Sequence, residues 1–347
     1  MKIKNIALLM AGFSFNALAI ENGVSVNWND NTDFLKLYSS DEYNSCSGTL
    51  IAGKYALTAA HCLLNGEPMT TITSASGQKA NIITPNTHPA YYDNDNGNNG
   101  NWHDVAVSEL NHYVETQQIH FFADLTTTPL QVDESVRVFG FGGTYEELNY
   151  ARFTITNKKP EEDSVFADMI ATGGNTTGGD SGAPWLKNNK IVSIHKGSKD
   201  SKNKPRKTYS TNLEYSSPFI LKTVNGWHYP TLANTSDGSA TITVQSLHQN
   251  TVTDSAHTSG DAQIVGGTCF DGQPVITAYE KCTYVIESQG GEGRLILGRS
   301  DEIIQINKPV PVIDNGSNDS GSGESDGGSF GLFGLLSLLG FGFYRRK

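Results

Sequence analysis

The stretch Gly-Gly-Asp-Ser-Gly-Ala-Pro at positions 178–184 constrains this chain more than any other, because it places a serine in a glycine-rich turn. Upstream, His61 follows two alanines, and Asp104 opens a run of apolar residues. A hydroxyl is a poor nucleophile at neutral pH, so it needs an imidazole to take its proton and a carboxylate to hold that imidazole in the right tautomer. The sequence therefore predicts that His61, Asp104 and Ser181 act together.

The order histidine, aspartate, serine and the residues around each resemble the motifs of trypsin- and chymotrypsin-like serine proteases. The resemblance implies an all-β fold in which two antiparallel β-barrels are followed by a C-terminal helix. It places the catalytic groups in the cleft between the barrels, with His61 and Asp104 in the first barrel and Ser181 in the second. It further implies an endopeptidase that hydrolyses proteins or peptides through an acyl-enzyme, without a metal or a cofactor.

The glycines beside Ser181 also have a chemical reason. A tetrahedral intermediate carries negative charge on the former carbonyl oxygen, and backbone N–H groups on a tight turn stabilise that charge. We expect the N–H groups of Gly179 and Ser181 to form this oxyanion hole.

The four cysteines allow three pairings. The resemblance implies that Cys46 and Cys62 form a disulfide beside His61, and Cys269 and Cys282 are then the remaining pair. Disulfides are typical of exported proteins.

The N-terminus predicts export. Lys2 and Lys4 precede an apolar run over residues 6–15, and Ala17-Leu18-Ala19 supplies the small residues that signal peptidase recognises. Residues 1–19 are therefore expected to be a signal peptide. A permanent membrane span is the alternative, although the apolar run is short for one.

Cleavage after residue 19 leaves a chain that begins with Ile20. In the trypsin-like enzymes such an N-terminus folds inward, and its ammonium pairs with the aspartate before the nucleophile. The resemblance thus implies a pair between Ile20 and Asp180. A frayed, solvated terminus is the alternative, and a separately cut propeptide remains open.

The C-terminus has three parts. Residues 312–329 are a linker dominated by Gly, Ser, Asp and Asn, which cannot bury enough apolar surface to order itself. Residues 330–344 are apolar and would make about 22 Å of helix, shorter than a bilayer span. Arg345-Arg346-Lys347 follows and should stay on the cytoplasmic side.

This tail resembles the GlyGly-CTERM sorting signal of Gram-negative bacteria. The resemblance implies transient membrane association, cleavage by a rhomboid-type intramembrane protease, use of the type II secretion machinery, and a final location at the cell surface or outside the cell. A simple membrane anchor is the alternative.

The body of the chain reads as two parts. Residues 20–230 hold short β-prone runs, among them 136–141 and 190–194, and a helix start with an early proline near Ser217. Residues 233–311 alternate as half-buried strands do, which favours a small immunoglobulin-like β-sandwich with a spacer or binding role. The net charge of −11 argues against a nucleic-acid partner.

The substrate pocket departs from trypsin. Trypsin has an aspartate six residues before its nucleophile, where this chain has Asn175. Thr176 and His195 are similar to the residues with which staphylococcal glutamyl endopeptidases bind a substrate carboxylate, and Ser198 would add a third donor. The sequence therefore predicts cleavage after glutamate, with a trypsin-like or other preference as the alternative.

Two polar segments of the chain remain to be interpreted. The loop 93–100 is rich in Asp and Asn and is either a flexible polar loop or a calcium site. The lysine-rich run 196–207 is expected to be a solvated loop whose charge attracts acidic segments.

Two alternative functions are a non-catalytic adhesin and a pseudoprotease, although no member of the triad is missing.

Overall fold

The computed structural model describes residues 20–92, 102–143, 147–170, 174–201, 204–272 and 274–309, and these ranges belong to one compact unit that ends at Pro309. The predicted signal peptide, the C-terminal linker and sorting segment, and the loop 93–100 lie outside the described residues. Within the described ranges, no helix combines the length and apolar character that crossing a membrane requires.

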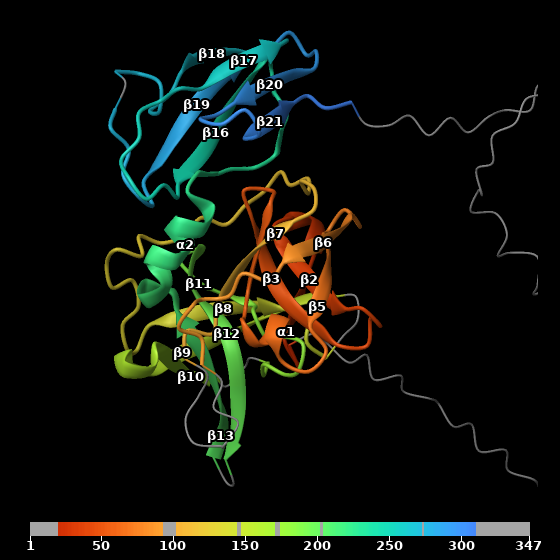
Figure 1. The fold of residues 1–347 in the computed structure, drawn as a ribbon, viewed down its shortest axis with the longest axis vertical. Helices are drawn as coiled ribbons and strands as arrows, with labels where there is room; N and C mark the ends of the chain where they lie inside the picture. The colour runs from red at the N-terminus through yellow and green to blue at the C-terminus, as the bar shows by residue number, and fades with distance from the viewer. Residues whose placement is uncertain are drawn as a thin grey trace, which may run out of the picture. The chain divides into compact units, whose positions relative to one another are not determined.

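The N-terminal part of the unit is a closed six-stranded barrel (Figure 1). Its strands are β2 (Phe34–Ser39), β3 (Ser45–Ile51), β4 (Tyr55–Thr58), β5 (Met69–Thr73), β6 (Lys79–Thr84) and β7 (Ala106–Leu110). They are antiparallel and follow the order β2-β3-β4-β7-β6-β5. Apolar side chains from several strands, such as Leu37, Leu50 and Ile72, fill the barrel and are fully buried.

The second barrel closes because β8 pairs with both β9 and β11. Its strands are β8 (Ser135–Gly140), β9 (Leu148–Lys159), β10 (Ser164–Met169), β11 (Pro184–Lys187), β12 (Lys190–Ser201) and β13 (Lys204–Asn212). The short strand β1 (Val24–Val26) adds to the outside of β9. The strands predicted at 136–141 and 190–194 are confirmed, although β12 continues well beyond the second prediction.

Helices are few and short. In the part of the chain that the structure describes, the two α-helices are α1 (His61–Leu64) and α2 (Ser217–Val224), and the three 3₁₀ turns are η1 (Trp28–Asp30), η2 (Pro160–Glu162) and η3 (Leu213–Ser216). Helix α2 has its proline in the first turn and ends at Asn225, whose left-handed backbone (φ 40°) stops the helix. The predicted C-terminal helix and double barrel are therefore both confirmed.

The remaining strands form two four-stranded sheets (Figure 1). One sheet contains β14 (Trp227–His228), β16 (Ser239–Ser246), β18 (Gln263–Gly266) and β19 (Lys281–Glu287). The other contains β15 (Leu232–Ala233), β17 (His257–Gly260), β20 (Gly293–Ile296) and β21 (Ile303–Ile306). The predicted β-rich module is thus present, while an immunoglobulin-like topology and the exact domain limits stay predictions.

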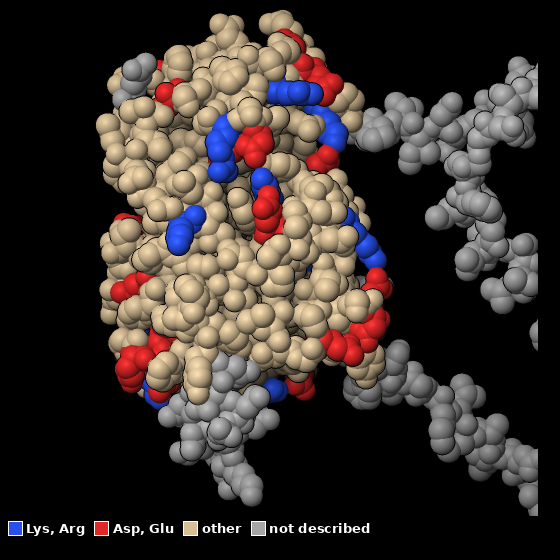
Figure 2. Space-filling model, viewed as in Figure 1, with Lys and Arg blue, Asp and Glu red and all other residues tan. Residues whose placement is uncertain are grey.

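The two-sheet module is joined to the barrels by buried contacts. Gln245 of β16 is 1% exposed, and its amide exchanges two hydrogen bonds of 2.9 Å with the backbone of Phe122. The hydroxyls of Ser217 and Tyr279 are 2.9 Å apart, and one hydrophobic cluster includes side chains of the second barrel and of both sheets. On the face drawn in Figure 2, acidic and basic side chains are interspersed.

Candidate active site

The three residues of the predicted triad lie at the ends of elements. His61 is the first residue of α1, Asp104 lies just before β7, and Ser181 lies in the turn before β11. The first two belong to the first barrel and Ser181 to the second. The barrels meet here, because the N–H of Ser47 on β3 donates to the carbonyl of Ser181 over 2.8 Å.

Asp104 holds His61 at two points. One carboxylate oxygen lies 2.7 Å from Nδ1 of the ring, and the other accepts the backbone N–H of His61 over 2.9 Å. Asp104 is fully buried, whereas the His61 side chain is 22% exposed. This arrangement fixes the ring orientation and leaves Nε2 on the side of the ring away from the carboxylate.

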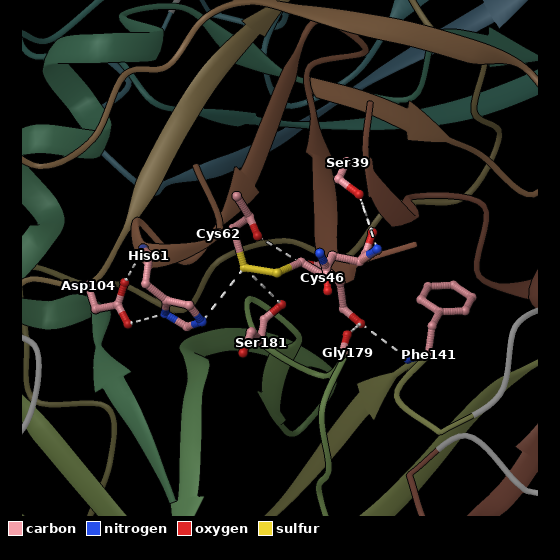
Figure 3. The surroundings of a disulfide bond; sticks show 11 residues. Ser39, Cys46, His61, Cys62, Asp104, Phe141, Gly179 and Ser181 are labelled. Carbon is pink, nitrogen blue, oxygen red and sulfur yellow. Dashed lines mark hydrogen bonds and ion pairs between the residues drawn. A yellow bond between two sulfur atoms is a disulfide. The ribbon is translucent and has the colours of Figure 1, made fainter. Parts of the chain in front are cut away.

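A disulfide lies against the same ring (Figure 3). Cys46 of β3 is bonded to Cys62 of α1, and Sγ of Cys62 lies 3.9 Å from Nε2 of His61 and 3.8 Å from the carbonyl oxygen of Ser181. His61 and Ser181 therefore flank one sulfur atom. The second predicted disulfide, Cys269–Cys282, is also present.

In the described residues, the ligand atoms of Cys46, His61 and Cys62 lie close enough to surround a metal ion. Both sulfurs are bonded to each other, so neither is available as a thiolate ligand.

The turn around Ser181 depends on two glycines with positive φ, Gly179 at 97° and Gly182 at 81°. A Cβ on Gly182 would collide with the carbonyl of Ser47, so a side chain has no room there. The hydroxyl of Ser47 donates to the carbonyl of Gly179 over 2.9 Å and accepts the N–H of Phe141 over 3.1 Å (Figure 3). Residues of both barrels thus set the shape of the turn.

Asp180 is fully buried beneath this turn. Its carboxylate accepts the N–H of Gly142 over 2.7 Å and that of Thr177 over 2.8 Å. Burial raises the pKa of Asp180 to about 7, against the opposing effects of these two donors and of the Arg206 charge. The carboxylate is therefore poorly compensated in the full-length chain.

The predicted partner of Asp180 is also buried. Ile20 has no exposed surface, and the carbonyl of the next residue, Glu21, accepts the N–H of Asn175 over 2.7 Å. The start of the predicted mature chain therefore packs against the segment that leads into the Ser181 turn. In the full-length chain the Ile20 nitrogen is a peptide nitrogen and carries no charge.

The predicted substrate-pocket residues come together through one residue that the sequence did not reveal. The hydroxyls of Thr176 and Thr208 are 2.7 Å apart, and the Thr208 hydroxyl lies 3.4 Å from Nδ1 of His195. All three are buried. The hydroxyl of Ser198 donates to the carbonyl of Thr176 over 3.2 Å, so it supports the segment that carries Thr176.

Arg206 also reaches this region. The sequence placed it in the lysine-rich run 196–207 but did not assign it to the substrate pocket. It lies two positions before Thr208 on β13, so both side chains project from the same face of that strand. Burial, then the His61 charge and the Arg206 charge lower the pKa of His195 to about 3. His195 is thus a neutral imidazole, and Arg206 is the cation near it. The alternation of side chains along β13 was the sequence signal that could have placed Arg206 beside Thr208.

One expectation was wrong. The run 196–207 was predicted to be a solvated loop, yet most of it lies in strands β12 and β13, and the side chain of Lys196 is 1% exposed. Lys199 and Lys207 of the same run are exposed, as predicted. A β-bulge explains the difference, because Lys196 is the extra residue between the paired positions His195 and Gly197.

Comparison with known proteins agrees with this geometry. The model of the family described as Trypsin matches residues 23–220, more than half of the chain. The protein belongs to the trypsin family. It is accordingly a serine endopeptidase, and the family match ends inside α2, before the two-sheet module.

Two curated relatives of this trypsin-family chain are each similar over about half of it. A trypsin from Saccharopolyspora erythraea is 26% identical over 198 residues, which cover 50% of this chain and 85% of the relative. Snake venom serine protease 3 from Craspedocephalus gramineus is 26% identical over 203 residues, which cover 53% and 78%.

Two solved structures from Vibrio cholerae are also similar, each with a TM-score of 0.47. The secreted serine protease VesC is 14% identical, and the match covers 82% of this chain and 70% of that one. The VesB protease is 19% identical, and the match covers 83% and 99%.

Proposed function

We propose that this serine endopeptidase is a secreted enzyme whose catalytic triad is His61, Asp104 and Ser181. The observation that carries the proposal is the double contact of Asp104 with His61, at 2.7 Å to the ring and 2.9 Å to the backbone. Ser181 Oγ attacks the scissile carbonyl while His61 Nε2 takes its proton. Asp104 keeps Nδ1 protonated and stabilises the imidazolium that forms.

The Ser181 turn supplies the second part of the chemistry. The N–H groups of Gly179 and Ser181 stabilise the negative oxygen of the tetrahedral intermediate. Support comes from the positive φ of Gly179 and from its carbonyl, which Ser47 holds by a hydrogen bond of 2.9 Å. Loss of one such donor typically costs about a hundredfold or more in rate.

The triad is tested by Ser181→Ala and His61→Ala, assayed on a generic protein substrate. Each change should lower kcat by several orders of magnitude and leave the thermal unfolding temperature nearly unchanged. The double variant should be little worse than either single one, because triad members act as a unit. Full peptidase activity in purified Ser181→Ala would overturn the assignment, and it would leave a binding protein on a protease scaffold as the alternative.

We further propose a preference for an acidic residue before the scissile bond, glutamate above aspartate. Asn175 stands where trypsin has its aspartate, so a basic substrate side chain would lose its partner. The side chains of Thr176, Thr208 and His195 form a row of polar groups. Arg206 adds a positive charge, which lowers the pKa of both His195 and Asp180. A guanidinium binds a carboxylate strongly.

Maturation is the third part of the proposal. Signal peptidase cuts after Ala19, and the new ammonium of Ile20 pairs with Asp180. The buried Ile20 and the poorly compensated carboxylate of Asp180 support this pairing. The C-terminal segment after about Gly328 is then removed by a rhomboid-type protease, and the enzyme leaves through the type II secretion machinery. The two-sheet module serves as a spacer or binding unit.

A further inference from the structure

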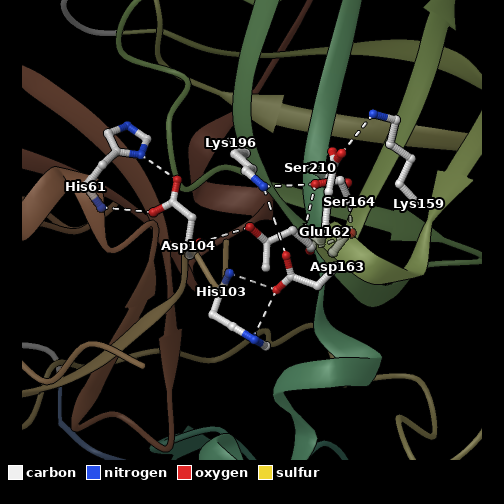
Figure 4. A network of polar contacts seen from close by, with 11 residues as sticks. His61, His103, Asp104, Lys159, Glu162, Asp163, Ser164, Lys196 and Ser210 are labelled. Atoms are coloured by element: carbon white, nitrogen blue, oxygen red, sulfur yellow. Dashed lines mark hydrogen bonds and ion pairs between the residues drawn. The ribbon is translucent and has the colours of Figure 1, made fainter. Parts of the chain in front are cut away.

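A second ionic cluster lies behind the proposed triad (Figure 4). Its members are the side chains of Lys196 and Asp163, which are 1% and 3% exposed. Nζ of Lys196 donates to Oγ of Ser164 over 2.9 Å and lies 4.0 Å from one oxygen of Asp163. Burying a charged group costs free energy unless the group is paired. The burial of Lys196 and Asp163 therefore points to a specific role, whereas exposed lysines mainly contribute to solubility.

Asp163 holds the residue that precedes Asp104. One oxygen of Asp163 accepts the backbone N–H of His103 over 3.0 Å and lies 3.2 Å from Nδ1 of its ring. His103 has a left-handed backbone (φ 49°), and its carbonyl accepts the N–H of Val105 over 2.7 Å. Asp104 is therefore the central residue of a tight turn. The first residue of that turn, His103, is held by Asp163 of the second barrel.

A third contact completes the support from the second barrel. The hydroxyl of Thr211 on β13 donates to the carbonyl of Asp104 over 3.1 Å. Lys196 is the bulged residue of the neighbouring strand β12. β-Bulges often occur next to active sites, where the extra residue changes the direction in which a side chain points.

We infer that Asp163 and Lys196 are positioning residues that hold the His103–Asp104 turn in place and balance the buried negative charge beside His61. The inference rests on the proposed triad. Two carboxylates, Asp104 and Asp163, are buried close together, and Lys196 is the buried cation between the elements that carry them. Removal of Lys196 leaves an excess negative charge near His61, and removal of Asp163 leaves an excess positive charge.

The electrostatics of the cluster agree with this reading. Burial raises the pKa of Asp163, while Lys196 and then His103 oppose the rise. Burial lowers the pKa of Lys196, while Asp163 and then Asp104 oppose the fall. In the described residues, other charged or titratable groups that face the cluster or the ring of His61 are Glu162, Lys159, His88, Tyr209, Tyr215 and His195. None of these is changed in the test below.

The test compares Lys196→Met, Asp163→Asn and the double variant with a matched control, Lys199→Met, an exposed lysine of the same strand. The readout is the dependence of kcat/KM on pH in the mature enzyme. Lys196→Met should move the acid limb to higher pH by roughly 0.5 to 1 unit, because the excess negative charge favours the His61 imidazolium. Asp163→Asn should move it to lower pH, and the double variant should lie between the two.

The kcat and KM values give the second readout. Both single variants should lose about tenfold in kcat with KM changed less than twofold, since neither side chain touches the substrate. Lys199→Met should match the unaltered enzyme. A purely structural role would lower stability without opposite shifts of the acid limb, and that result would overturn the inference.

The other outcomes are equally informative. If Lys196→Met fails to fold, the downward shift in the near-isosteric Asp163→Asn decides alone, and its absence would overturn the inference. Active Ser181→Ala would instead show that the proposed triad itself is wrong, so the two failures are distinguishable.

Discussion

His195 acts as a neutral hydrogen-bonding group, because burial lowers its pKa to about 3. A neutral imidazole offers one N–H and one acceptor, and Thr208 lies 3.4 Å from its Nδ1. In the proposed pocket, His195 and Thr208 therefore orient a substrate carboxylate but do not neutralise it. The positive charge must come from elsewhere, and Arg206 is the residue placed to supply it.

Arg206→Gln should lower kcat/KM for substrates with glutamate before the scissile bond by about tenfold to a hundredfold, the typical cost of a lost charged hydrogen bond. Cleavage after neutral residues should change far less. The neighbouring Lys207→Gln, at an exposed position, is the matched control and should preserve the ratio between the two substrates. A peptide library measures both, and cleavage after lysine or arginine by the unaltered enzyme would contradict the acidic preference.

At this scale the sequence predicted what short motifs carry. His61, Asp104 and Ser181 each sit in a recognisable local context, and the structure brings His61 and Asp104 into contact. Thr208 and Arg206 lie on a strand without a motif, and only its pairing with β12 brings them near His195. The burial of Lys196 was not predicted, because it depends on a bulge in the pairing of β12 with β13. A run of lysines in the sequence does not reveal such a bulge.

Among the elements, β16 connects the two-sheet module directly with the protease part of the chain. Its Gln245 amide bonds to both backbone groups of Phe122 and to the carbonyl of Tyr279, each over 2.9 Å. The alternation noted across residues 233–311 is visible in β16 and β19, each of which buries every second residue in part of its length. The short strand β14, which continues the protease chain into the module sheet, carries no such pattern and was not predicted.

Gln245→Leu should reduce the free energy of unfolding by roughly 3 kcal/mol, since it leaves three buried backbone groups without partners. The exposed Gln249→Leu is the control and should change stability by less than about 0.5 kcal/mol. Denaturant unfolding followed by both peptidase activity and tryptophan fluorescence checks this. We expect one shared transition at lower denaturant; a module that unfolds separately while activity persists would contradict the coupling.

For the whole molecule, the charge balance depends on where the chain begins. Asp180 in the full-length chain has a pKa of about 7, above its ordinary value of 3.8. Because the folded state then holds its proton more tightly than the unfolded state, the stability of the uncut chain should fall as pH rises from about 4 to about 7. An ammonium on Ile20 would compensate the carboxylate and remove this decline.

A chain that keeps Ala19 before Ile20 should therefore match the mature protein in stability near pH 4 and be less stable at pH 7.5, by up to about 4 kcal/mol. Thermal unfolding at the two pH values measures the difference, and the extended chain should also be less active. Intact mass of the exported protein establishes the natural ends, which we expect at Ile20 and near Gly328. Fully active enzyme that starts well downstream of Ile20 would refute the pairing.

The bond between Cys46 and Cys62 ties α1, which begins with His61, to strand β3 of the first barrel. Cytoplasmic thiols are generally kept reduced, so on the proposed secretion route this bond would form only after the chain has left the cytoplasm. Until then the segment that carries His61 lacks its covalent anchor. On the proposed secretion route, the oxidising environment outside the cytoplasm would therefore add the last covalent constraint on this part of the site, after synthesis is complete.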